Sequence, residues 1–113
     1  MPADQSKPSS IAVIVAAKNA GDTISLCLKS ALLGLREDDE LLVFLDGCSD
    51  DTPEKVRAIA DSRVRVFESE TGVGRSEARN YLIKKSTSNY IAVLDADDIA
   101  LPWRFGSMRE EYT

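Results

Sequence analysis

The sequence contains no histidine among its 113 residues. Without an imidazole the chain cannot form a Ser-His-Asp triad, a Cys-His pair or a His-ligated zinc or haem site. Its two cysteines, Cys27 and Cys48, are too few for a thiolate zinc cluster and lie too far apart for a redox Cys-x-x-Cys motif. They provide no disulfide framework either, so we expect a reduced, cytoplasmic protein.

Long hydrophobic runs are also missing. The longest, residues 11–17, has seven residues, whereas a membrane-spanning helix needs roughly 20. No basic leader precedes it, so we predict neither a transmembrane segment nor a signal peptide. Basic residues are in the minority, 14 against 19 acidic ones, for a net charge of −5, which argues against a nucleic-acid partner. With 43% hydrophobic and 29% charged residues, the composition is that of one small globular domain.

Apolar runs alternate with helical patterns along most of the chain. Residues 1–10 lack apolar periodicity and are expected to be a disordered tail, followed by a folded unit over residues 11–113. Unbroken or alternating apolar segments predict strands at 11–16, 41–45, 63–67 and 90–94. Helical apolar spacing falls within 24–35, 53–60, 75–82 and 101–112. Asp22 or Thr23 is suited to begin the first of these helices.

This strand–helix order predicts an α/β fold with a mostly parallel sheet and helices on both faces, because right-handed crossovers join parallel neighbours. In such sheets ligands bind outside the carboxyl ends of the strands. The segments that follow the four predicted strands are residues 17–19, 46–51, 69–74 and 95–98. We therefore expect the functional site to be built from these segments.

Acidic residues follow two of the strands. Asp95 and Asp97 form an Asp-x-Asp motif, and in an extended segment residues i and i+2 point the same way. Paired carboxylates suit Mg²⁺ or Mn²⁺. Without a cation, each close pair of negative charges, one on these acids and one on a diphosphate, would repel by about 4 kcal/mol at an effective dielectric near 20. A bound cation would offset this repulsion. Asp46 ends the second strand. The alternatives are a solvated turn or helix cap for the Asp-x-Asp motif and a turn former before Gly47 for Asp46.

A glycine-containing loop suggests a second interpretation. Gly72-Val-Gly74 precedes a predicted helix, and Asp95 lies 21 residues after Gly74, near the spacing of the ribose-binding acid in dinucleotide-binding domains. Two features disagree with that pattern. Glu77 occupies the third glycine position, and the loop follows the third strand instead of the first. A dinucleotide-binding oxidoreductase domain is therefore the less favoured alternative.

Four segments together carry a family resemblance. They are Val13-Ile-Val-Ala-Ala-Lys-Asn19, Leu45-Asp-Gly-Cys-Ser-Asp-Asp-Thr52, Gly74-Arg-Ser-Glu-Ala-Arg-Asn80, and Tyr90-Ile-Ala-Val-Leu-Asp-Ala-Asp-Asp98 with Leu101-Pro102. In this order they resemble the amino-terminal, Rossmann-like half of a family 2 glycosyltransferase of the GT-A fold. The resemblance implies nucleotide-sugar binding and metal-dependent, inverting transfer of a sugar from a nucleotide-diphosphate sugar to an acceptor hydroxyl.

The resemblance also implies roles for individual residues. Asp46 matches the acid that bonds the donor's base or ribose, and Asp95 the first acid of the metal motif, near the ribose. Asp97 matches the acid that ligates Mn²⁺ or Mg²⁺, with Asp95 beside it. Arg75 and Arg79 lie in the segment that lines the donor pocket. Arg79 has the alternative role of tying its helix to neighbouring carbonyl groups.

The resemblance covers only the first half of such a domain. We expect the acceptor half, including the catalytic base, to be absent from this chain, so no catalytic residue is assigned. A non-catalytic nucleotide-binding or assembly module is accordingly an alternative to the enzyme. An isolated half would expose apolar surface and a sheet edge, so a homo-oligomer is expected.

Overall fold

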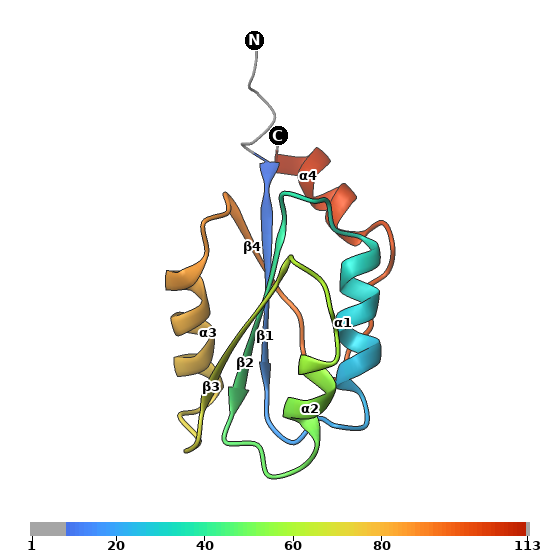
Figure 1. The fold of residues 1–113 in the computed structure, drawn as a ribbon. Helices are drawn as coiled ribbons and strands as arrows, with labels where there is room; N and C mark the ends of the chain where they lie inside the picture. Colours follow the sequence, from blue (N-terminus) through green and yellow to red (C-terminus); the bar gives the residue numbers. More distant parts are fainter. Residues whose placement is uncertain (1–8, 113) are drawn as a thin grey trace.

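The structure is a computed structural model that describes residues 9–112 (Figure 1). Residues 1–8 of the expected tail lie outside the described residues.

The four strands are β1 (Ile11–Ala17), β2 (Glu40–Asp46), β3 (Val64–Ser69) and β4 (Tyr90–Val93). The four helices are α1 (Ile24–Leu33), α2 (Thr52–Arg57), α3 (Arg75–Lys85) and α4 (Arg104–Tyr112). Strands and helices alternate strictly, as the sequence predicts. Within residues 9–112, none of the helices has the length and apolar character needed to cross a bilayer.

The sheet is entirely parallel, with the strand order β3-β2-β1-β4. Ala17 pairs with Leu45 at the end of β1, and Asp46 pairs with Ser69 at the end of β2. The carboxyl ends of the three neighbouring strands therefore meet at one edge of the sheet (Figure 1). The α/β fold class predicted from the sequence is confirmed.

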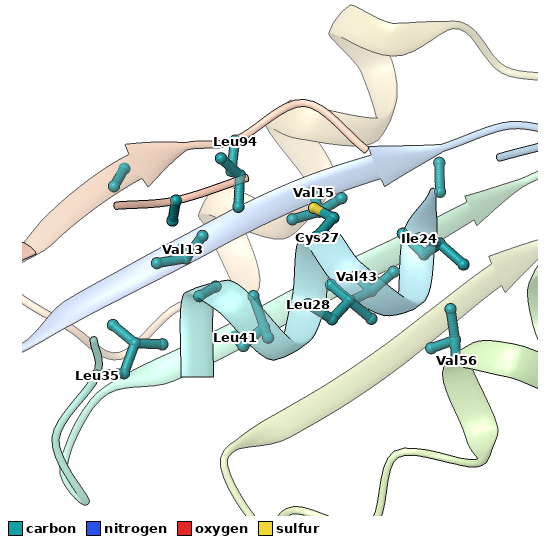
Figure 2. Packing of buried hydrophobic residues seen from close by; sticks show 14 of the residues in the cluster. Val13, Val15, Ile24, Cys27, Leu28, Leu35, Leu41, Val43, Val56 and Leu94 are labelled. Carbon is teal, nitrogen blue, oxygen red and sulfur yellow. The ribbon is translucent and has the colours of Figure 1, made fainter. Parts of the chain in front are cut away.

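Helices cover both faces of the sheet because β1 and β2 are apolar at successive positions. Alternate side chains of a strand point to opposite faces, so each face receives its own apolar set. One face packs against α1, α2 and α4, with Cys27 and Leu28 of α1 lying over Val15 and Val43 (Figure 2). The other face packs against α3 and includes Ala12, Ile14, Leu42, Phe44, Ala78 and Leu82. This explains why residues 11–15 are completely buried.

A buried ion pair holds α4 at the amino-terminal end of the sheet, opposite the edge where the strands finish. The Arg109 guanidinium donates to both carboxylate oxygens of Asp39, at 2.8 and 2.6 Å. Asp39 also accepts hydrogen bonds from the backbone N–H groups of Ile11 and Arg36. A further bond runs from Arg109 to the carbonyl of Ser9, one of the last residues of the expected tail. The pair thus joins α4, the start of β1 and the segment before β2.

Two local expectations are wrong. The helix α2 ends at Arg57, so Ile59 and Ala60 lie beyond it, where the chain turns toward β3. Leu101 is not part of the last helix, because the residue before Pro102 is disfavoured from helical conformation. Trp103, which follows Pro102, is 64% exposed.

Candidate functional site

A pocket of about 940 Å³ opens at the carboxyl-terminal edge of the sheet. This volume lies within the usual range of small-molecule sites, roughly 300–1,000 Å³. Residues from all four strand-end segments line it. They include Lys18, Asn19, Asp22, Thr23, Asp46, Gly72, Val73, Gly74, Arg75, Asp95 and Asp97. The site therefore lies where the parallel topology predicts it.

Asp46 organises the loop between β3 and α3. Its side chain is almost fully buried, and its two oxygens accept hydrogen bonds from the backbone N–H groups of Val73, at 2.7 Å, and Gly74, at 3.0 Å. Each carboxylate oxygen can accept more than one hydrogen bond, so Asp46 can still receive a donor from the pocket. A phosphate-cradling loop would have to offer these same N–H groups to the ligand. Their use by Asp46 argues against the dinucleotide-binding interpretation.

Three carboxylates gather in the turn that follows β4. Oxygen atoms of Asp95, Asp97 and Asp98 all lie within 4.8 Å of one another, and the three residues are exposed. The turn is closed by a hydrogen bond from the N–H of Asp98 to the carbonyl of Asp95, at 3.0 Å. We expected an extended segment here, and this is wrong, because β4 ends at Val93 and the chain bends. The bend adds Asp98 to the cluster, which alternation along a strand did not predict.

The acidic turn is held from both faces of the sheet. On the α1 face, the Cys27 thiol donates to the carbonyl of Asp95, at 3.3 Å, and the Thr23 hydroxyl donates to the carbonyl of Ala96, at 3.0 Å. Thr23 is the N-cap residue of α1, one of the two positions expected, but its side chain makes no capping hydrogen bond. On the α3 face, Arg79 Nη2 lies 2.9 Å from Asp95 Oδ1. The position of the turn is therefore fixed by both helices.

Burial, and to a smaller extent the negative charges of Asp98, Asp97 and Asp95, raise the pKa of the Cys27 thiol to about 12. The thiol stays protonated at neutral pH and remains a hydrogen-bond donor to the turn. Because the thiolate is the nucleophilic form, Cys27 is a structural and unreactive cysteine.

The loops after β1 and β2 are tied together at the base of the pocket. Asn19 has a left-handed backbone conformation, with φ of 51°, a position that asparagine tolerates better than most residues. Its side-chain oxygen accepts hydrogen bonds from the N–H groups of Ser49, at 2.7 Å, and Asp50, at 3.2 Å. Asp50 in turn accepts a bond from the N–H of Gly21. This part of the pocket is consequently preorganised by loop-to-loop hydrogen bonds.

The structure brings most of the predicted site residues together. Asp46, Arg75, Asp95 and Asp97 line the pocket, whereas Arg79 lies behind it and touches the site through Asp95. The sequence placed Lys18 and Asn19 at the site only as part of the segment that follows the first strand, and it offered Asp22 only as the start of a helix. The structure adds all three residues to the pocket lining.

Comparison with known proteins identifies the family. The model of "Glycosyl transferase family 2" matches residues 12–112, and the chain belongs to this family. The prediction made from four sequence motifs is thereby confirmed. Succinoglycan biosynthesis protein ExoU of Rhizobium meliloti is 41% identical over 89% of this chain and 30% of its own length. The Escherichia coli protein WfgD, named as a UDP-Glc:alpha-D-GlcNAc-diphosphoundecaprenol beta-1,3-glucosyltransferase, is 38% identical over 79% of this chain and 35% of its own.

Solved structures agree on the fold. Staphylococcus aureus TarS 1–349 in complex with UDP-GlcNAc superposes with a TM-score of 0.83 at 22% identity, covering 89% of this chain and 30% of TarS. Glucosyl-3-phosphoglycerate synthase of Mycobacterium tuberculosis, solved with Mn²⁺, UDP and glucosyl-3-phosphoglycerate, has a TM-score of 0.68 at 27% identity, covering 83% of this chain and 36% of the synthase. The chain spans about a third of the length of the curated relatives it matches.

Proposed function

We propose that this chain forms the donor-binding part of a metal-dependent, inverting glycosyltransferase whose donor is a nucleotide-diphosphate sugar. The observation that carries the proposal is the meeting of Asp46, Asp95, Asp97 and Arg75 around one pocket at the strand ends. Membership of glycosyl transferase family 2 supports it. Because the chain spans only part of its relatives, we propose that the acceptor half and the catalytic base lie outside residues 9–112.

The residues of the acidic turn suit a hard divalent cation. Asp97 and Asp95 would hold Mn²⁺ or Mg²⁺, with Asp98 close enough to contribute a third oxygen. A cation held there supplies the positive charge that stabilises a leaving diphosphate. Arg75, at the rim of the pocket, adds a second positive charge for the donor's phosphates. Asp46, fixed by the β3–α3 loop, faces the nucleoside with its remaining acceptor capacity.

The reaction we propose is a single displacement. An acceptor hydroxyl oxygen attacks the anomeric carbon, its proton passes to a carboxylate base, and the bond between that carbon and the diphosphate oxygen breaks, with inversion of configuration. UDP-sugars are the first donors to test, since a relative's name and a related structure both involve uridine nucleotides. We further propose a cytoplasmic location, in keeping with two free cysteines among the described residues.

The test is calorimetric titration of UDP into the chain with and without Mn²⁺. We expect binding only when the cation is present, and at least tenfold weaker binding for Asp97→Asn, equivalent to about 1.4 kcal/mol. Glu110→Gln, at an exposed position of α4, is the matched control and should bind like the wild type. Equal UDP affinity with and without Mn²⁺, or an unaffected Asp97→Asn variant, would refute the proposal.

Self-association remains a prediction of its own. Large apolar side chains are exposed near β4, which pairs with β1 on one side only. They are Val93, Ile99, Leu101 and Trp103. Sedimentation of the chain over a range of concentrations will show whether it forms homo-oligomers.

A further inference from the structure

Arg79 is the only basic side chain within residues 9–112 that forms an ion pair with the acidic turn. It extends from the second turn of α3 and places Nη2 at 2.9 Å from Asp95 Oδ1. The side chains of Arg79 and Asp95 are 29% and 53% exposed, so the guanidinium is the more enclosed partner. Its Nε is buried and has no hydrogen-bond partner among the described residues. The guanidinium is therefore held in place by a single ion pair.

This position gives Arg79 two opposite electrostatic effects. The turn carries three carboxylates, and Arg79 compensates one of their negative charges at very short range. A divalent cation that approaches the turn alone is repelled by the guanidinium and must share Asp95 with it. A diphosphate that approaches with the cation is attracted by the same guanidinium. Ions near a partly buried pair are also screened less than ions at an open surface.

Arg79 can exert both effects without entering the pocket. It is absent from the residues that line the cavity, whereas Asp95 lines it. The guanidinium bonds only Oδ1 of Asp95, which leaves Oδ2 available to a ligand on the pocket side. The backbone of the turn does not depend on Arg79, because Cys27 and Thr23 bind it from the α1 face. The charge of Arg79 can thus be separated experimentally from the architecture of the turn.

We propose that Arg79 is a positioning residue that couples cation binding to nucleotide binding. It weakens the binding of a divalent cation alone to the turn of Asp95, Asp97 and Asp98, and it strengthens the binding of a nucleoside diphosphate together with that cation. Cation and nucleotide then load together, and each raises the affinity for the other, as linkage requires. The inference rests on the proposed function, because it takes the pocket to be a nucleotide site.

The experiment compares two affinities in the same chain. The first is that of Mn²⁺ alone, measured from the electron paramagnetic resonance signal of free Mn²⁺. The second is that of UDP at saturating Mn²⁺, measured by calorimetry. For Arg79→Met, which removes the charge and keeps the length of the stem, we expect Mn²⁺ alone to bind about fivefold more tightly and UDP with Mn²⁺ to bind about fivefold more weakly. Arg79→Lys keeps the charge and should stay within twofold of the wild type in both measurements.

Arg36→Met is the matched control, since Arg36 forms an exposed ion pair with Asp38 before β2, remote from the pocket. It should change neither affinity. If Arg79→Met weakens both affinities by the same factor, Arg79 has only a structural role and the proposal is overturned. Unchanged affinities overturn it as well. Should Arg79→Met fail to fold, Arg79→Gln serves as the second neutral variant and is judged by the same two affinities.

The two levels of the hypothesis fail in different ways. If the wild-type chain does not bind UDP with Mn²⁺, the proposed function is wrong and the coupling falls with it. If the wild type binds UDP with Mn²⁺ but Arg79→Met shows no opposite change in the two affinities, only the coupling is wrong. Raising the ionic strength should also reduce the difference between wild type and Arg79→Met, because the effect is electrostatic.

Discussion

Gly47 follows Asp46 directly, and the backbone there leaves no room for a side chain. Its φ is 65°, in the left-handed region, and a Cβ atom would lie 2.8 Å from the backbone nitrogen of Gly72. The loops after β2 and β3 therefore approach each other backbone to backbone at this point. The contact supports the pair of hydrogen bonds by which Asp46 fixes the β3–α3 loop.

We predict that Gly47→Ala destabilises the fold by about 2 kcal/mol, because a left-handed conformation costs a non-glycine residue roughly 1–2 kcal/mol and the added methyl group also clashes. Urea denaturation measures the loss. Gly106→Ala in α4 is the control, since a Cβ there meets no atom within 4 Å. Alanine is favoured over glycine in a helix interior by about 1 kcal/mol, so this variant should gain stability. An unchanged urea midpoint for Gly47→Ala would contradict the close approach.

At this scale the sequence identifies acids better than it identifies their partners. Asp46, Asp95 and Asp97 could be predicted as pocket residues because each follows an apolar strand. The partners of Asp46 are backbone groups 27 and 28 residues later, and no residue type marks them. The same limit applies to Arg79, since its contact with Asp95 depends on how α3 crosses the sheet.

At the scale of elements, α4 is the segment most dependent on one interaction. Its Arg109 side chain is 10% exposed and the Asp39 side chain is completely buried, so the pair lies in a region where an uncompensated charge is costly. The pair is also far from the pocket, at the opposite edge of the sheet. Variants of it should therefore change stability without changing the site directly.

We predict that Asp39→Ala costs about 3–5 kcal/mol, because it leaves buried Arg109 without its carboxylate and removes the acceptor of two backbone N–H groups. Arg109→Met should cost less, since Asp39 keeps both of those N–H donors. Chemical denaturation gives the two values. Asp38→Ala removes an exposed ion pair with Arg36 and should cost less than about 1 kcal/mol. Equal losses for Asp39→Ala and Asp38→Ala would show that the buried pair contributes little.

The order and type of the elements could be read from apolar periodicity, but their spatial order could not. Residues 63–67 alternate between polar and apolar, a pattern typical of a strand near an edge, and β3 is at one edge of the sheet. The segment 90–94 is continuously apolar, as a central strand would be, yet β4 is at the other edge and Val93 is 42% exposed. The apolar composition of a strand depends on whether its two faces are covered. It does not indicate which strands lie beside it in the sheet.

At the scale of the whole molecule, titratable groups in separate parts of the fold together set the dependence of stability on pH. Hydrogen bonds from the Arg63 side chain lower the pKa of Asp61 to about 2. Burial alone would raise the pKa of Asp39, but hydrogen bonds from Arg109 and from backbone N–H groups outweigh it, and the pKa is lowered. Cys27 behaves in the opposite way, since burial and the acidic turn raise the pKa of its thiol to about 12.

These pKa shifts predict that the free energy of unfolding is constant over a middle range of pH and declines on both the acid and the alkaline side. Below about pH 4 the unfolded chain binds protons that folded Asp61 and Asp39 do not, so stability falls as the pH drops, for Asp61 between 3.8 and about 2. Above pH 9 the unfolded chain loses the Cys27 proton that the folded chain keeps up to about pH 12, so stability falls again as the pH rises.

Urea midpoints measured between pH 2 and 11 will map this dependence of stability on pH. Asp61→Asn should flatten its acid side and Cys27→Ala its alkaline side, each relative to that variant's own plateau. An alkaline decline that is as steep in Cys27→Ala as in the wild type would show that the thiol beside the acidic turn is not its origin.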